Sequence, residues 1–518
     1  MYSQLVNESL NNEIHNYLDR LEIKNIIKLE TEKKPFTVEE IKIKLLELRN
    51  KYNQLTDYEK RKLGRYLTYY HLANKKTIYP YEIKDEKSIF SFMPIGGYGV
   101  RYLNDKNGWE RVGGIKVYGS YKNQISIYAH LQDRGEFGNF IDTKKYISPE
   151  RGYEFQRTQK GIEYSDVIGG IGIYTEWGSL ALMKDYVRWG HGEFGQLILS
   201  DKVNSFPHVN FELKLMKNLR LKYLFGWLNS KVIDSNYYYE SYPGSNVNER
   251  RYNFINKYIV SNLLTFEPWY FLKLSLGNSI IYSGNSLRME MFLPLAIYKY
   301  LDRDVGKGSI SDGNGQMFFD FAIKPMKGLR LYSTFFVDML SISKTLRGNY
   351  IENWFGYTTG MKLIDKPLKN SDFIFEFTKI EQWVYEHKDI TTTYKHLNYL
   401  LGHWIGQNAY LISLKYSYYI NSQINFGIKY YFLKKGGEED IYYAYEGRKE
   451  KTLGFLYPPI KKDIVYEINI NYEPITSLIF NFLYRYSIIR DDMKNRTPTF
   501  LMGEKHFYRI GFSFGFPY

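Results

Sequence analysis

Two stretches of the sequence, residues 185–200 and 401–408, place tryptophan beside charged and amide side chains between glycines. Flat aromatic rings stack on the C–H faces of sugars, and arginine, histidine and glutamine bind carboxylates and hydroxyls. The chemistry predicted is therefore binding of an acidic sugar, on two stretches that must meet in space. The alternative is that both stretches only close an interior or anchor strands. The candidate sugar-binding residues are Arg188, Trp189, His191, His403, Trp404 and Gln407.

Signals for catalysis and for cofactors were sought as well. The chain has no cysteine, and its nine histidines show no metal-ligand spacing. Residues 190–195 match G-x-G-x-x-G, but the strand and helix that a dinucleotide site requires are not predicted around them. No other catalytic motif is present, so we expect a non-enzymatic protein without metal or cofactor. A hydrolase stays open as a third hypothesis, and its sign would be a serine within hydrogen-bond reach of a histidine.

The elements that must position these stretches are strands. Aromatic residues make up 18% of the chain, yet its mean hydropathy is −0.44. No apolar run is long enough for a membrane-spanning helix. From about residue 76 bulky residues recur at every second position, as in 478–488 and 508–516. Rows of this kind are typical of strands with one face toward lipid and one toward a polar lumen.

We therefore predict an all-β transmembrane antiparallel barrel of roughly 16–18 strands over residues 76–518. Short turns such as 216–218 alternate with long polar stretches such as 434–462. The register predicts outward rings and inward small or basic residues. The outward set is Phe426, Phe480, Phe482, Phe512 and Phe514, and the inward set is Arg220, Lys222, Ser513 and Gly515. The aromatic last residue, Tyr518, resembles the signal read by the barrel assembly machinery.

The first 75 residues have a helical period instead. Apolar residues recur every three or four positions over 10–21, and capping boxes at 37–40 and 56–59 predict two further helix starts. We expect an N-terminal helical bundle over residues 1–75, packed at the periplasmic mouth of the barrel. Residues 1–10 lack the features of a signal peptide, so the barrel interpretation requires a sequence that starts after the processing site.

The net charge of +14 favours acidic partners. Acidic sugars and the phosphates of lipopolysaccharide are the expected ones, beside outer-membrane lipids. Nucleic acid is not expected, because no motif for it is present. The excess charge could instead only line the loops and the lumen.

Several segments resemble the capsule assembly Wzi family. They are residues 17–21 (YLDRL), 34–37 (KPFT), 185–200 (DYVRWGHGEFGQLILS), 206–208 (FPH), 281–284 (IYSG), 293–295 (LPL) and 401–408 (LGHWIGQN). The resemblance implies an outer-membrane barrel with a periplasmic helical bundle. It also implies that the protein holds capsular polysaccharide at the cell surface. Periplasmic export components are further possible partners. The competing hypothesis is a porin or specific channel for small acidic or sugar solutes, which would keep an open lumen.

Overall fold

The structure is a computed structural model of the chain. It describes residues 7–73, 80–122, 124–143, 145, 151–240, 250–305, 313–340, 353–438, 440–442 and 454–515. The predicted end of the last strand at 516–518 and the predicted domain boundary near 75 lie outside these residues.

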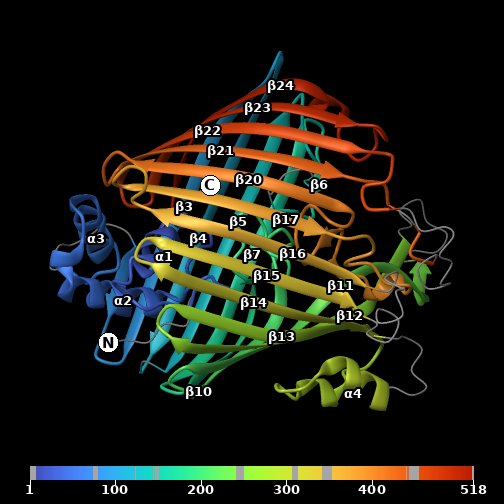
Figure 1. Ribbon diagram of the computed structural model, residues 1–518, viewed down its shortest axis with the longest axis horizontal. Helices are drawn as coiled ribbons and strands as arrows, with labels where there is room; N and C mark the ends of the chain where they lie inside the picture. The colour runs from blue at the N-terminus through green and yellow to red at the C-terminus, as the bar shows by residue number, and fades with distance from the viewer. Residues whose placement is uncertain are drawn as a thin grey trace.

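Three helices form near the N-terminus: α1 (Ile14–Ile23), α2 (Val38–Asn50) and α3 (Asp57–Tyr69). The side chains of Thr37 and Thr56 accept hydrogen bonds from the backbone of Glu40 and Glu59, and both glutamates return the bond, so the two predicted capping boxes are confirmed. The apolar faces of the helices share one buried cluster. A further helix, α4 (Tyr298–Val305), lies in a loop at the other end of the molecule (Figure 1).

The rest of the described chain forms a closed antiparallel barrel of eighteen long strands, which confirms the predicted fold class. Pairing of β24 with β3 closes it, with Tyr508 opposite Tyr102. The strands are β3 (Ser88–Leu103), β4 (Lys106–Tyr121), β5 (Ile125–Gly138), β7 (Gly161–Thr175), β8 (Gly178–Asp185), β10 (Phe206–Met216), β11 (Leu219–Glu240), β12 (Arg250–Trp269), β13 (Leu272–Ser283), β14 (Asn314–Met326), β15 (Leu329–Met339), β16 (Trp354–Ile364), β17 (Ser371–Ile380), β20 (Ala409–Tyr419), β21 (Ile424–Lys435), β22 (Lys461–Ile475), β23 (Leu478–Asp491) and β24 (Gly503–Phe514).

Short strands complete the sheets. β2 (Tyr81–Lys84) pairs with the start of β3, and β6 (Gln156–Arg157) pairs with β7. Two two-stranded ribbons stand apart from the barrel sheet: β1 (Lys33–Lys34) with β9 (Arg188–Trp189), and β18 (Lys395–His396) with β19 (Tyr399–Leu400).

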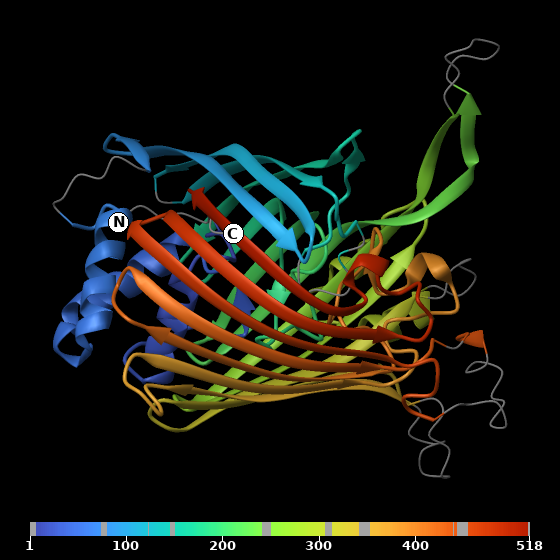
Figure 2. The same cartoon turned by 90° about the horizontal axis from the view of Figure 1, so that it is seen from above.

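The two ends of the barrel differ. The helices lie at the end where consecutive strands join by short turns, such as the turn from Met216 to Leu219 (Figure 1). The long connections lie at the other end, where the β11–β12 hairpin projects beyond the barrel (Figure 2). We refer to these ends as the turn end and the loop end.

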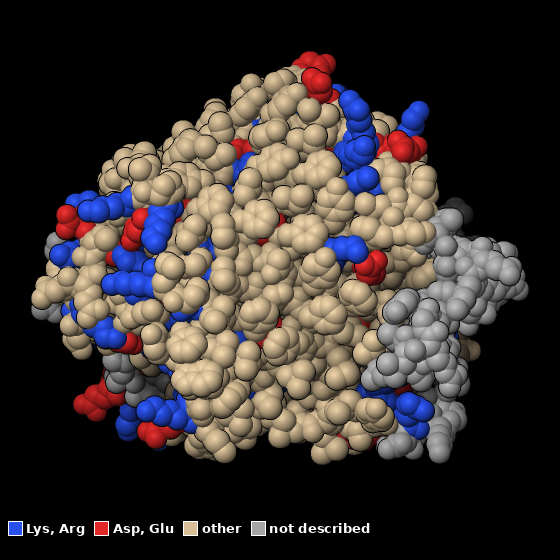
Figure 3. Space-filling view, in the orientation of Figure 1, with Lys and Arg blue, Asp and Glu red and all other residues tan. Residues whose placement is uncertain are grey.

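The strand register agrees with the sequence pattern. Phe480 and Phe512 are 45% and 42% exposed on the outer wall, whereas Ser513 and Lys222 are 1% exposed and face the lumen. Figure 3 shows an outer wall almost free of charged side chains between the two ends, with charge gathered near the helices. A wall of apolar rings with no charge is what lipid requires.

One sector of the outer wall departs from this pattern. Tyr223 and Phe225 alternate with the inward Lys222 and so face outward, but a strap formed by the β13–β14 connection covers them, so they are buried. The ring of Phe292 stacks on Phe225 at 4.6 Å between centroids, and the hydroxyl of Tyr223 donates to the carbonyl oxygen of Met291. Because alternation records only which face a residue is on, it could not predict that a loop covers that face.

Helix α1 and the segment that follows it enter the lumen from the turn end and are held there by ion pairs. Inward basic side chains on successive strands meet acids of α1 and the segment that follows it. The pairs are Arg220–Glu30 at 3.1 Å and Lys222–Glu32, Lys324–Glu22, Arg330–Asp19 and Lys362–Asp19, each at 2.7 Å. Some of the basic side chains that give the protein its positive net charge therefore form ion pairs inside the barrel. Residues 14–33 act as a plug of the turn end, and this name is kept below for that segment.

Candidate functional site

Two connections fold inward and fill the lumen above the plug: residues 186–205, between β8 and β10, and residues 381–408, between β17 and β20. Their apolar side chains pack on inward residues of the strands in one buried cluster that includes Trp189, Phe194 and Trp404. The lumen is thus occupied by protein at this level. The two stretches singled out in the sequence, 185–200 and 401–408, lie almost wholly within these connections.

The two stretches bond directly to each other. The indole nitrogen of Trp404 donates to the carbonyl oxygen of Phe194 at 2.7 Å. The hydroxyl of Ser200 donates to the carbonyl oxygen of Gly402 at 2.6 Å, and the amide of Ser200 donates to that of Leu401 at 2.7 Å. The predicted meeting of the two stretches is therefore confirmed.

A glycine makes this close approach possible. A Cβ at Gly195 would lie 2.4 Å from Nε2 of His403, a distance that no side chain tolerates. His403 itself is fully buried, and burial lowers its pKa to about 3, so its ring is neutral. His403 and Gly195 therefore set the spacing between the two stretches.

A cavity of about 220 Å³, called the inner cavity below, lies beside this contact. Its walls carry an aromatic ring, an amide and more basic than acidic groups. The polar and aromatic lining includes Arg188, Glu193, Gln196, Lys202, Trp404, Lys415, Lys429 and Tyr431.

Hydrogen bonds and an ion pair to other parts of the chain hold several of these lining side chains in place. Arg188 and Gln196 both donate to the carbonyl oxygen of Gly192 at 2.6 Å, which fixes a guanidinium and an amide at one wall. The Oε1 atom of Gln196 is buried without a hydrogen-bond partner among the described residues. This acceptor is therefore unused, and a ligand hydroxyl would reach it only after the amide turns toward the cavity. Lys429 pairs with Glu467 at 3.2 Å.

Of the six predicted residues, Arg188 and Trp404 line the inner cavity. The other four have internal partners. Trp189 packs in the buried cluster, and Oε1 of Gln407 accepts the backbone N–H of Trp383 at 2.7 Å. His403 spaces the two stretches as described above.

His191 joins the plug to the barrel wall. Its Nδ1 lies 2.5 Å from Oδ2 of Asp320, and its Nε2 lies 2.9 Å from the hydroxyl of Thr31. A hydroxyl, an imidazole and a carboxylate in that order resemble a nucleophile with its base. All three are buried, however, and none of them lines the inner cavity. The arrangement therefore gives no substrate access to the hydroxyl.

The sequence interpretation missed Gln196, Lys202, Lys415 and Lys429. A signal existed for Lys429, since its row places it on the inward face of β21. Gln196 lies within the stretch 185–200, but no ring or charge distinguished it there.

No helix among the described residues is long and apolar enough to cross a membrane. The closed barrel, the exposed apolar rings of its outer wall and its occupied lumen define an outer-membrane β-barrel of the non-porin kind. The family model described as capsule assembly protein Wzi matches residues 175–480, and the chain belongs to that family.

A solved structure shares the fold. The chain is similar over 100% of both chains, with a TM-score of 0.59 and 13% identity, to a structure titled as Wzi of Escherichia coli. That title describes an outer membrane protein involved in group 1 capsule assembly and a carbohydrate binding β-barrel. OprD of Pseudomonas aeruginosa matches with a TM-score of 0.41 and 10% identity, over 82% of this chain and 94% of its own. OccAB2 of Acinetobacter baumannii matches with a TM-score of 0.44 and 11% identity, over 82% of this chain and 97% of its own. No curated protein sequence matches the chain.

Proposed function

We propose that this protein binds acidic capsular polysaccharide at the outer face of the outer membrane and holds it there without catalysing a reaction. The observation that carries the proposal is the inner cavity, where Arg188 and Trp404 come together from two connections. A guanidinium binds a sugar carboxylate through charge-assisted hydrogen bonds, and an indole stacks on a sugar ring. Membership of the Wzi family supports the same function, since the Escherichia coli protein is described as carbohydrate binding.

The projecting β11–β12 hairpin offers a second contact for a polymer at the loop end. Tyr237, Tyr238 and Tyr239 are 54%, 48% and 64% exposed there. Exposed tyrosines supply flat rings with a hydrogen-bonding tip. A polymer that reaches the inner cavity passes this end of the barrel first.

The orientation is part of the proposal. Short turns are typical of the periplasmic end of outer-membrane barrels and long loops of the outer end. Residues 1–75 would then form a periplasmic domain and residues 76–518 the barrel. Lipid and lipopolysaccharide contact the outer wall, the barrel assembly machinery inserts it, and export components meet the helices. A porin fits less well, because the plug and the two inward connections occupy the lumen.

The test replaces the two cavity residues in cells that make an acidic capsule. We expect Arg188→Gln with Trp404→Ala to release capsule into the medium while the amount of folded barrel in the membrane stays unchanged. Trp383→Ala is the matched control, because Trp383 is an equally buried indole of the same cluster that does not line the inner cavity. Equal release from both variants, or loss of barrel together with capsule, would show that the residues only support the fold.

A further inference from the structure

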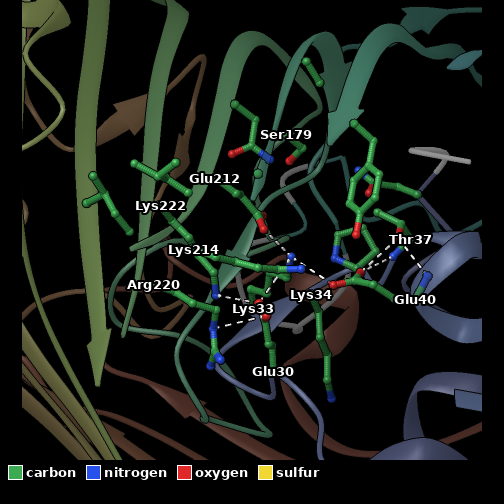
Figure 4. Close-up of a pocket in the computed structure, with 18 of the residues that line it drawn as sticks. Glu30, Lys33, Lys34, Thr37, Glu40, Ser179, Glu212, Lys214, Arg220 and Lys222 are labelled. Atoms are coloured by element: carbon green, nitrogen blue, oxygen red, sulfur yellow. Dashed lines mark hydrogen bonds and ion pairs between the residues drawn. The ribbon is translucent and has the colours of Figure 1, made fainter. Parts of the chain in front are cut away.

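A second and larger cavity lies at the turn end, on the other side of the plug's last residues. Its volume is about 760 Å³, within the range of ordinary ligand sites. The inward faces of β8, β10 and β11 form one wall, and the start of α2 with the segment before it forms the other. Figure 4 shows Glu212, Lys214 and Lys222 from the strands on one side and Thr37 and Glu40 on the other. We call it the mouth cavity.

Basic groups outnumber acidic ones around the mouth cavity, by eight side chains to five. The acids are largely engaged deep in the cavity: Lys33 lies 2.6 Å from Glu212 and 3.2 Å from Glu40. At the rim, Lys214 and Lys217 are exposed and have no ion-pair partner within the described part of the chain. Glu176 is exposed in the same lining and also has no ion-pair partner in the described residues, so the two lysines leave the entrance with a net positive charge.

Aromatic rings stand beside these lysines. Trp177 is 62% exposed at the tip of the β7–β8 turn, and Nζ of Lys214 lies 5.9 Å from the ring centroid of Tyr174. Ser179 and Asn210 add a hydroxyl and an amide to the same wall. Rings, ammonium groups and small hydrogen-bonding groups are the set that binds an acidic sugar.

The β1–β9 ribbon separates the mouth cavity from the inner cavity. Lys33 pairs with Trp189 and Lys34 with Arg188. Trp189 lines the mouth cavity, whereas its neighbour Arg188 lines the inner one. The two cavities thus lie on opposite sides of the β1–β9 ribbon.

We propose that the mouth cavity is a second binding site for acidic oligosaccharide segments, so that the protein contacts its polymer on both sides of the ribbon. This inference rests on the proposed function, and its test must separate the two sites. The probe is hexagalacturonate, a uniformly acidic chain, and maltohexaose is the neutral control.

The first measurement uses a reporter at the rim. The chain has no cysteine, so Met216→Cys gives one labelling site beside the mouth cavity. Met326→Cys is its matched control, because Met326 occupies the same place in the β14–β15 turn, is similarly exposed and does not line the cavity. We expect hexagalacturonate to change the fluorescence at position 216 saturably and at position 326 not at all, and maltohexaose to change neither.

The second measurement is calorimetry on the unlabelled full chain in detergent. Trp177→Ala with Lys214→Gln should weaken mouth binding by about tenfold or more, as expected for loss of one stack and one charge contact. Trp269→Ala with Lys327→Gln removes an exposed ring and an exposed lysine from other turns, and should leave binding unchanged. Heat-modifiable migration on gels checks that each variant is a folded barrel.

The outcomes separate the two sites. A response at position 216 that survives Arg188→Gln with Trp404→Ala supports the mouth site. No response at 216, with calorimetric binding abolished by the inner-cavity variant alone, overturns the mouth site and leaves the proposed function standing. A response at position 216, with calorimetric binding unchanged in the inner-cavity variant, supports the mouth site and overturns the proposal that the inner cavity binds the sugar. Equal responses at 216 and 326, or no binding by either method, overturn the proposal.

Discussion

Trp404 donates its indole N–H to the carbonyl oxygen of Phe194, 210 positions earlier in the chain. This bond ties two inward connections whose strands lie on different sectors of the barrel. It also orients the indole at the wall of the inner cavity.

Trp404→Phe keeps a flat ring but leaves the buried carbonyl of Phe194 without its donor. We expect the contact between the two connections to weaken by about 1–3 kcal/mol, the cost of an unsatisfied buried group. Faster hydrogen exchange in peptides covering 190–200 would measure it. Unchanged exchange together with lost glycan binding would mean that the ring acts only on the ligand.

Replacement of a plug acid should undock the plug. In Glu22→Gln the charges of Lys324 and Arg330 lose a buried partner, and breaking such a pair costs about 3–5 kcal/mol. The readout is the anisotropy of a fluorophore on Asn50→Cys, an exposed position on α2, measured against urea. Glu47→Gln is the control, because Glu47 pairs with Lys44 and Lys51 near the surface, where a pair contributes at most about 1 kcal/mol. Equal urea midpoints for the two variants would contradict the plug's electrostatic attachment.

Acid should undock the plug in the same assay. Burial alone would raise the pKa of Glu22, but Arg330, Lys273 and Lys324 outweigh it and hold the pKa at about 2, below its usual 4.5. Glu30 is lowered to about 2 in the same way, against burial, by Lys33, Lys222 and Arg220. Because both folded pKa values are depressed, the stability that these groups contribute is complete above about pH 4.5 and is lost as the pH falls toward 2.

A buried histidine of the plug adds to the acid sensitivity. Burial lowers the pKa of His15 to about 4, so its protonation below its usual 6.5 also favours the undocked state. We expect the anisotropy at position 50 to fall in acid, and to fall at a higher pH in Glu22→Gln. A pH-independent signal down to pH 2 would contradict this.

Deletion of residues 8–72 should leave a chain that still inserts as a heat-modifiable barrel. The strand pairs from β3 to β24 close without any residue of the helices. Failure of the truncated chain to insert would assign the helices to barrel folding instead.

The sequence predicted the barrel because lipid and lumen impose an alternation that each strand repeats locally. Phe480 and Phe512 show it, and the capping boxes at Thr37 and Thr56 are local in the same sense. The alternation did not predict the plug's ion pairs, since Lys222, Lys324 and Lys362 each lie on a different strand and nothing local indicates that they face the plug. The two-residue β1–β9 ribbon is too short to produce a period.

For the site, the sequence identified both connections, and two of six named residues line the inner cavity. Tryptophan and histidine are conspicuous in any sequence, but whether a ring faces a cavity or a core depends on packing. Trp189 and Trp404 are both buried in one cluster, yet Trp189 lines the mouth cavity and Trp404 the inner cavity, which no local pattern in the sequence distinguishes.

The β1–β9 ribbon also couples the connection that carries Arg188 mechanically to the plug. Arg188 follows the end of β8 by three residues, so tension on a polymer held beside it is carried first by the covalent chain to the barrel wall. Part of the tension passes through the backbone hydrogen bonds of the ribbon to Lys33 and Lys34, and from there to the plug. The ion pairs of the plug share that part among several strands, so a pull from the loop end is also resisted at the turn end.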